Sequence, residues 1–300
     1  MSPELVAAII AASVSLLTLI GSVAAQIYGI RRTSRDTEKT RNEQREQLDK
    51  TLKEQSKQLD RTLAEQRART LNERFATAAD KLGSDKPPAV RLAGVYAMAG
   101  LADDWEENRQ TCIDVLCAYL RLPYAPDPGE DAPAGERLAF GADREVRHTV
   151  IRVITAHLWH DARTSWQGLH FDFTSVTFDG GDFSGAVLSG GTVYFNGAQF
   201  TGGTVDFARA EFSGSTVYFN DAQFTGGTVN FRSAGFSGST VSFDHAQFSG
   251  GTVSFNSAMF TGGPVDFSHA VGWSHPPLFD WKGKPPAGVT LPASISGESQ

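Results

Sequence analysis

Residues 192–270 read TVYFNGAQFTGG, TVDFARAEFSGS, TVYFNDAQFTGG, TVNFRSAGFSGS, TVSFDHAQFSGG, TVSFNSAMFTGG and PVDFSHA, so a twelve-residue unit recurs along the whole stretch. A fixed short period of this kind is typical of a solenoid. Within each unit Val and Phe stand two residues apart, as in Val193 and Phe195, and so do Ala and Phe, as in Ala198 and Phe200. Because side chains alternate along a strand, each pair points to one side. One unit therefore predicts two short strands joined by Gly-rich corners.

A full coil of this solenoid is expected to contain two units. Residues 201–224 and 225–248 match one another better than adjacent units do, because the corners TGG and SGS alternate. This period predicts four strands per coil. The Phe-to-Phe steps alternate between five residues (Phe195 to Phe200) and seven (Phe200 to Phe207), so the sides should be unequal. Stacked coils would place Phe on Phe and Ala on Ala at about 4.8 Å per coil.

The stretch directly upstream has a shorter period. Residues 171–191 read FDFTSVTFDGGDFSGAVLSGG, with large apolar residues five apart at Phe173, Phe178, Phe183 and Leu188. This pattern resembles the pentapeptide-repeat family, in which Leu or Phe occupies each central position and a small residue stands two positions before it. The Ala-x-Phe pairs fit this pattern, whereas the Val-x-Phe pairs and the two additional residues per unit depart from it.

The resemblance implies a right-handed, four-sided parallel β-helix over residues 166–271. It implies no activity, because the family shares a scaffold without shared chemistry.

The amino-terminal part indicates a membrane anchor. Residues 5–30 contain no charged residue and would form a helix roughly 39 Å long, enough to cross a hydrocarbon core of about 30 Å. A cleaved signal peptide is the alternative, with residues 22–24 as a small-residue cleavage site. However, Glu4 precedes the apolar run and Arg31 and Arg32 follow it, which is the opposite of a signal peptide. The positive-inside rule then predicts a single-pass inner-membrane (plasma-membrane) helix with its N-terminus outside and the bulk of the chain in the cytoplasm.

Residues 31–75 are highly charged, lack Gly and Pro, and contain three copies of an eleven-residue unit beginning at Glu43. A narrow apolar stripe is formed by Leu48, Leu52, Leu59 and Leu63. Eleven residues in three turns favour helices that pair nearly straight or with a gentle right-handed supercoil. The alternative is a lone solvated helix stabilised by ion pairs such as Glu46 with Lys50. We expect a coiled-coil-like stalk that associates with a second copy.

Residues 76–163 predict a small helical domain that covers the amino end of the β-helix. Apolar residues recur at helical spacing in residues 71–82, 89–101, 109–122 and 145–157, and a Pro- and Gly-rich loop occupies residues 124–141. Cys112 and Cys117 are the only cysteines and are expected to be buried thiols in a reducing compartment.

The tail, residues 272–300, contains Trp273, Phe279 and Trp281 among several prolines and predicts a cap over the last coil, with a frayed end at residues 295–300. The order of anchor, stalk, helical module and repeats resembles membrane-anchored bacterial pentapeptide-repeat proteins of actinobacterial type.

No catalytic motif is present, so we expect neither an enzyme nor a bound cofactor or metal. His148, His157 and His160 lack a partner at metal-ligand spacing. The acidic run 103–107 is interpreted as capping and dipole stabilisation of the helix that begins near Glu107. The phosphate-binding pattern GxxxxGK[ST] is absent.

The favoured function is a non-enzymatic scaffold that presents a rigid β-helical surface to a cytoplasmic protein. Its outward residues vary from coil to coil, and we select as the candidate protein-binding residues Tyr194, Asp206, Tyr218 and Arg232. The alternative is an acidic mimic of DNA that acts on a topoisomerase such as gyrase, because residues 171–270 contain eight acids and two arginines. Nucleic acid itself is not expected as a partner. A third hypothesis, cleavage of acidic polysaccharides, needs a cluster of charged side chains on one face that the repeats do not supply.

Overall fold

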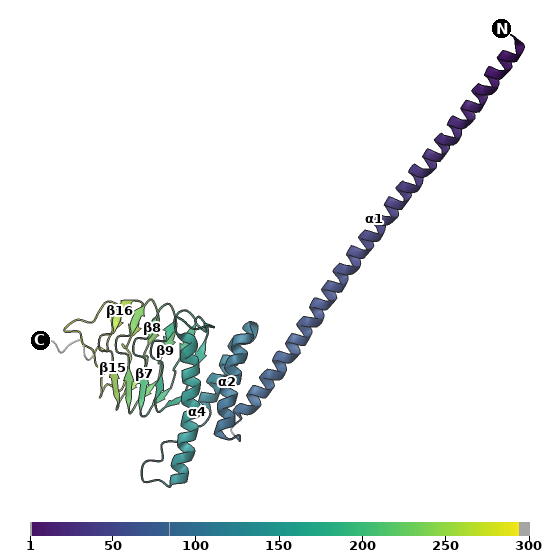
Figure 1. The fold of residues 1–300 in the computed structure, drawn as a ribbon. Coiled ribbons are helices and arrows are strands. Elements are labelled where there is room, and N and C mark those ends of the chain that lie inside the picture. The colour runs from purple at the N-terminus through teal and green to yellow at the C-terminus, as the bar shows by residue number, and fades with distance from the viewer. Residues whose placement is uncertain (1, 84, 294–300) are drawn as a thin grey trace. The chain divides into compact units, whose positions relative to one another are not determined.

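The computed structural model describes residues 2–83 and 85–293, apart from the side chains at positions 6 and 33–36. The chain divides into two compact units, Met1–Arg69 and Thr70–Gln300. Helix α1 (Pro3–Leu82) is continuous over 80 residues (Figure 1). The predicted anchor, the predicted stalk and the first predicted helix of the helical module are therefore parts of one helix.

The part of α1 in the first unit has exposed side chains. Among the described residues, α1 is the one helix that is long and apolar enough to cross a membrane, and none of its apolar window is buried. The leucines at positions 48, 52, 59 and 63 are exposed as well. In the second unit the same helix has an apolar face, on which Leu71, Ala78 and Leu82 are buried in a common core.

Three further helices follow in the second unit: α2 (Pro88–Asp104), α3 (Arg109–Arg121) and α4 (Ala134–Leu158), with a short 3-10 helix, η1 (Glu106–Asn108), between the first two. The beginning of α4 at Ala134 differs from the sequence prediction, which placed residues 124–141 in a loop. Pro133 directly precedes the helix and Glu136 lies in its first turn, and both features favour a helix start. The prediction gave too much weight to Gly135 and Gly141.

The remaining residues form a parallel β-solenoid with four sides, each a sheet of short strands. Sheet A contains β1 (Phe171–Asp172), β5 (Thr192–Tyr194), β9 (Thr216–Tyr218), β13 (Thr240–Ser242), β17 (Val265–Asp266) and β18 (Val289–Thr290). Sheet B contains β2 (Thr177–Phe178), β6 (Gln199–Phe200), β10 (Gln223–Phe224) and β14 (Gln247–Phe248). Sheet C contains β3 (Gly181–Asp182), β7 (Thr204–Asp206), β11 (Thr228–Asn230) and β15 (Thr252–Ser254). Sheet D contains β4 (Val187–Leu188), β8 (Glu211–Phe212), β12 (Gly235–Ser237) and β16 (Met259–Gly262).

The register between coils confirms the predicted coil of two units with four strands. Val217 pairs with Val193 on one side and with Val241 on the other, an offset of twenty-four residues in both directions. The first coil is shorter, because Thr177 pairs with Gln199 at an offset of twenty-two. The two additional residues of the longer coils are accommodated at the Gly-Gly corners that lead into sheet C.

Phenylalanine rings fill the interior in four columns, one for each side. Rings in successive coils stack nearly parallel, as between Phe195 and Phe219, whose centroids are 4.6 Å apart at 3°. Rings on the opposite sides A and C meet edge to face, as Phe219 and Phe231 do at 85°. Both arrangements are favourable for aromatic pairs. The interior is thus a packed core of Phe, Val and Ala.

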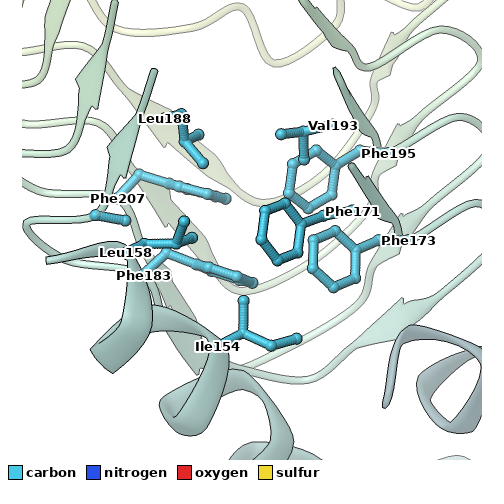
Figure 2. Close-up of a pocket in the computed structure, with 10 residues that line it drawn as sticks. Ile154, Leu158, Phe171, Phe173, Phe183, Leu188, Val193, Phe195 and Phe207 are labelled. Carbon is cyan, nitrogen blue, oxygen red and sulfur yellow. The ribbon is translucent and has the colours of Figure 1, made fainter. Parts of the chain in front are cut away.

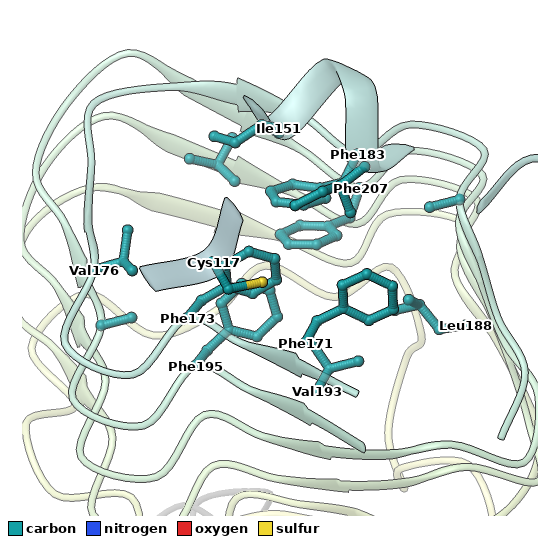
Figure 3. Close-up of a cluster of buried hydrophobic side chains, with 14 of the residues drawn as sticks. Cys117, Ile151, Phe171, Phe173, Val176, Phe183, Leu188, Val193, Phe195 and Phe207 are labelled. Carbon is teal, nitrogen blue, oxygen red and sulfur yellow. The ribbon is translucent and has the colours of Figure 1, made fainter. Parts of the chain in front are cut away.

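Helices α3 and α4 cover the amino end of the solenoid. Figure 2 shows Ile154 and Leu158 against the rings of the first two coils, and the space left among these side chains is about 10 Å³, close to the volume of one water site. Figure 3 shows Cys117 and Ile151 over the same rings. Thr155 donates a hydrogen bond to the carbonyl oxygen of Asp182 at 2.8 Å. The helices and the solenoid therefore share one continuous hydrophobic core.

The tail, predicted as a Pro-rich cap, also continues the solenoid. Trp273 and Trp281 pack against the last rings, as predicted. However, β18 pairs with β17 at the same offset of twenty-four residues, with Val289 opposite Val265. Phe279 stacks on Phe255 at 5.2 Å and extends its column. Residues 278–288 thus continue the fifth coil, and β18 begins a sixth. The predicted frayed end, residues 295–300, lies outside the described residues.

Candidate functional site

The structure separates the four predicted binding residues into two pairs. Tyr194 in β5 and Tyr218 in β9 lie on sheet A, where their rings stack with centroids 5.7 Å apart at 15°. Asp206 in β7 and Arg232, which follows β11, belong to the sheet C side. Successive strands of a coil occupy sheets A, B, C and D in turn, so A and C are not neighbouring sides. A single flat partner surface cannot contact all four residues at once.

The side chain of Asp206 forms hydrogen bonds within the sheet C side of the solenoid. Its Oδ1 accepts a hydrogen bond from the backbone N–H of Ala208 at 2.8 Å and another from Nδ2 of Asn230 in the next coil at 3.0 Å. The same turn recurs where the backbone N–H of Arg232 donates to Oδ1 of Asn230 at 3.0 Å. Asp and Asn favour such turns because their side chains satisfy the N–H two residues on. Asp206 therefore has a structural role, whereas the side chain of Arg232 is exposed.

The two tyrosines point outward because each stands between an inward Val and an inward Phe. In β5 and β9 the pattern of burial alternates, with the central Val buried and the flanking residues half-buried. Each ring covers part of the other, which fixes both in position. A rigid aromatic pair on an outer face is a surface that loses little conformational entropy when it binds.

A partly buried polar cluster, which the sequence did not predict, lies where α4 meets the first coil. Asp179 is its centre: Oδ1 lies 3.1 Å from Nε2 of His148, and Oδ2 lies 2.8 Å from the hydroxyl of Tyr124 and 3.0 Å from Nε of Arg144. The guanidinium of Arg147 sits 4.2 Å from the centre of the Tyr124 ring. We name this set of five residues the Asp179 cluster.

The cluster shifts the pKa values of its members. Burial by itself would raise the pKa of Asp179, but hydrogen bonds from His148 and Tyr124 together with the charges of His148 and Arg144 lower it below the usual value. Burial, with the hydrogen bond to Asp179, raises the pKa of Tyr124 far above its usual range. The stable state is thus an ionised Asp179 beside a neutral Tyr124.

A groove of about 470 Å³ opens beside this cluster. It is lined by Tyr124, Phe140 and Arg144 from the loop and α4, and by Gln199 of β6 and the following Thr201 from the solenoid. Asp179 itself already contacts three side chains, so it is poorly placed to act as a base or a nucleophile. The arrangement fits a contact that holds the loop before α4 against the solenoid.

The acidic run at residues 103–107 does not cap a helix through its side chains, contrary to the sequence interpretation. Neither η1 nor α3 has a side-chain cap. The carboxylate of Asp103 instead receives the indole N–H of Trp166 at 3.1 Å and lies 3.2 Å from Nε2 of His157. Asp104 forms an ion pair with Arg74 at 2.8 Å. These acids join helices α1, α2 and α4 to the segment before the solenoid.

The three histidines considered as metal ligands have separate acidic partners: His148 faces Asp179, His157 faces Asp103, and His160 faces Glu211 at 3.1 Å. Within residues 2–83 and 85–293, no group of three or more metal-binding side chains comes together.

No protein-family model, curated protein or solved structure matches this chain. Function must therefore be inferred from the geometry of its own surfaces.

Proposed function

We propose that this protein is a non-enzymatic scaffold, held at the inner membrane by residues 5–30, that presents the outer face of sheet A to a cytoplasmic protein partner. The observation that carries the proposal is the stacked pair Tyr194 and Tyr218 on that face. Tyr is among the residues that contribute most to protein interfaces. The packed interior supports the same conclusion, since it leaves the outside of the solenoid as the working surface.

The membrane anchor is supported by the order of charges along α1. An exposed apolar run of this length needs a non-aqueous environment, and a membrane span and a signal sequence both meet that need. The acidic residue before the run and the arginines after it favour the span with its N-terminus outside. The solenoid would then lie in the cytoplasm, where Cys112 and Cys117 would remain free thiols, as they are in the structure.

We also propose a relationship to the pentapeptide-repeat proteins. The four-sided parallel solenoid and the five-residue spacing of the first coil support it. The later coils depart from the pattern, because they carry inward Val-x-Phe pairs and longer corners. Such a relationship would supply a scaffold and no chemistry.

Site-directed photo-crosslinking in membranes tests the docking face. A photoreactive amino acid is placed at position 218 on sheet A or at position 232 on the sheet C side of the full-length protein. We expect a discrete crosslinked partner from position 218 and none from position 232. The same partner from both positions, or none from position 218, would refute sheet A as the docking face.

Matched variants separate binding from folding. Tyr194→Ala with Tyr218→Ala should reduce capture of the crosslinked partner at least about tenfold, in line with the loss of two aromatic contacts. Arg232→Ala, which removes an exposed side chain from the other pair, should leave capture unchanged. Equal loss in both variants would argue against a role for the tyrosine pair.

The DNA-mimic alternative receives less support from the geometry. About five coils span roughly 24 Å at about 4.8 Å per coil, which corresponds to about seven base pairs. Asp172 is paired with Arg121, and Asp179 contacts Arg144, so these two acids of the first coil are partly neutralised. Inhibition of DNA supercoiling by the purified full-length protein in detergent would revive this alternative.

A further inference from the structure

The leucine stripe of α1, formed by Leu48, Leu52, Leu59 and Leu63, is exposed in the first unit. Each of these side chains is more than half exposed, with fractions of 58, 53, 59 and 53%. The spacings of four, seven and four residues keep all four on one narrow face of the helix. Four leucines in one line are an apolar face that a further helix can cover.

The charged residues between positions 46 and 67 avoid this face completely. At about 100° per residue, the four leucines occupy an arc of about 60°. The charged residues all fall within a separate arc of about 160°, centred on the opposite side of the helix: Glu46, Asp49, Lys50, Lys53, Glu54, Lys57, Asp60, Arg61, Glu65 and Arg67. Glu46 and Lys50 form an ion pair with each other on that side at 2.7 Å. Gln, Thr and Ser flank the leucines, as at Thr51, Gln55 and Thr62.

The absence of charge on the leucine face indicates which partner it fits. In a parallel pair of identical helices in register, each residue faces its own copy across the axis. A charged position on that face would bring like charges together, which is unfavourable. A face of leucines flanked by neutral polar residues avoids this repulsion, whereas a different, charged partner helix would find no complementary charge beside the leucines.

We propose that the leucine stripe pairs with the same stripe of a second copy, parallel and in register, between Leu48 and Leu63. The parallel direction rests on the proposed function, because two chains anchored by residues 5–30 in one membrane run in the same direction. The eleven-residue offset of Leu48 to Leu59 and Leu52 to Leu63 gives a nearly straight pair. Confinement to one membrane raises the effective concentration and so compensates for the short length of the stripe.

Cysteine crosslinking in membranes tests the pairing with a control on the same helix. Cys112 and Cys117 are buried, so a single introduced cysteine is the accessible thiol among the described residues. Under mild oxidation the full-length Leu59→Cys protein should form a disulfide-linked dimer. Lys57→Cys, on the opposite side of the helix, should give at least about tenfold less dimer. Equal dimer from both variants, or none from Leu59→Cys, would overturn the pairing.

A second experiment tests direction and register. Chains carrying Leu48→Cys and chains carrying Leu63→Cys, each with a different tag, are produced together. Positions 48 and 63 lie about 22 Å apart along the helix, so a parallel pair in register gives 48-to-48 and 63-to-63 dimers alone. A mixed 48-to-63 dimer would mean an antiparallel pair and would overturn the proposal.

A third experiment measures dimer formation and membrane retention in the same variant, so that a failure of the helix pairing can be distinguished from a failure of the membrane anchor. Introducing Leu52→Asn and Leu59→Asn into the Leu48→Cys protein should lower dimer formation at least about fivefold, while the protein remains in the membrane after carbonate extraction. Loss from the membrane would count against the anchor and the parallel direction. Full retention with undiminished dimer would count against the leucine stripe.

Discussion

Nε2 of His148 lies 3.1 Å from Oδ1 of Asp179, and this contact joins helix α4 to the first coil of the solenoid. Both side chains are mostly buried, with exposed fractions of 20 and 15%. Tyr124 and Arg144 reach the same carboxylate from the loop before α4 and from α4 itself. A single acid of the repeat region therefore holds both α4 and the loop before it against the solenoid, and neither of these elements belongs to the repeat.

Replacement of Asp179 should weaken this junction. In Asp179→Asn the charge that faces His148 and Arg144 is lost while the side-chain volume is kept, so we expect the free energy of unfolding to fall by about 2 kcal/mol. Asp182→Asn is the matched control, because Asp182 is exposed and an amide oxygen can still accept from the N–H of Ser184. Urea denaturation of the full-length proteins in detergent measures both. A loss as large in the control would show that the buried cluster has no special role.

The same junction should depend on pH. The pKa of Asp179 is lowered in the folded state because the contacts with His148, Tyr124 and Arg144 outweigh its burial. A carboxyl of this kind contributes stability above its unfolded pKa of about 3.9, and the contribution is lost as the pH falls through the lower, folded pKa. The difference in stability between the wild-type protein and Asp179→Asn should therefore shrink between about pH 5 and pH 2. A constant difference over this range would contradict an ionised Asp179.

The repeat predicted the solenoid well because every inward position repeats. Val, Ala and Phe recur at fixed spacing, and this spacing gave the four-strand coil and the ring columns that the structure contains. The last part of the solenoid, which completes the fifth coil and begins the sixth, was not predicted because the motif ends at Ala270, although Phe279 and Val289 keep the offset of twenty-four residues. A search for single inward residues at that offset, rather than for the whole motif, would have found it.

The repeat does not predict the Asp179 cluster. It also does not show directly that the four candidate binding residues lie on two different sides of the solenoid. The cluster depends on tertiary contacts from Tyr124 and His148, which lie far from Asp179 in sequence. The four outward residues were chosen for variation between coils, without assigning each one to a side. Since consecutive units alternate between sheets A and C, Tyr194 and Asp206 necessarily face different sides.

The two thiols should be inert in the folded protein. Burial raises the pKa of Cys112 to about 11 and that of Cys117 to about 12. Because the thiolate is the reactive species, modification by a thiol reagent at pH 8 should be at least about a hundredfold slower than in guanidinium chloride. Stability should also fall as the pH rises from about 8.5 toward 11, since the unfolded thiols ionise before the folded ones. Rapid modification of either cysteine at pH 8 would contradict the buried packing.

The residue before each inward Ala from Ala186 to Ala258 has a positive φ, and glycine there should stabilise the solenoid. Ser233 has a φ of 57°, in the left-handed region that costs most residues about 1–2 kcal/mol, whereas Gly185 occupies the same corner two coils earlier. Part of the gain is offset by the greater freedom of glycine in the unfolded chain. We expect Ser233→Gly to raise the free energy of unfolding by about 0.5–1 kcal/mol and Ser233→Ala to change it little. Urea denaturation distinguishes the two, and a stabilising alanine would contradict relief of backbone strain as the cause.

The Gly-Gly corners bring successive coils into direct backbone contact, and this predicts a sharp difference between two glycines. A Cβ at position 250 would lie 2.1 Å from the carbonyl oxygen of Thr225, while a Cβ at position 235 would meet no atom within 4 Å. Neither Gly250 nor Gly235 has a positive φ, so the two variants differ in the steric clash of the added methyl group and not in backbone strain. Gly250→Ala should therefore lower the free energy of unfolding by about 3 kcal/mol, because the backbone of the neighbouring coil must shift to admit the methyl group. Gly235→Ala should be neutral or slightly stabilising, since it restricts the unfolded chain without a clash. If urea denaturation gave equal losses for both variants, the close approach of the coils at this corner would not be what sets the requirement for glycine.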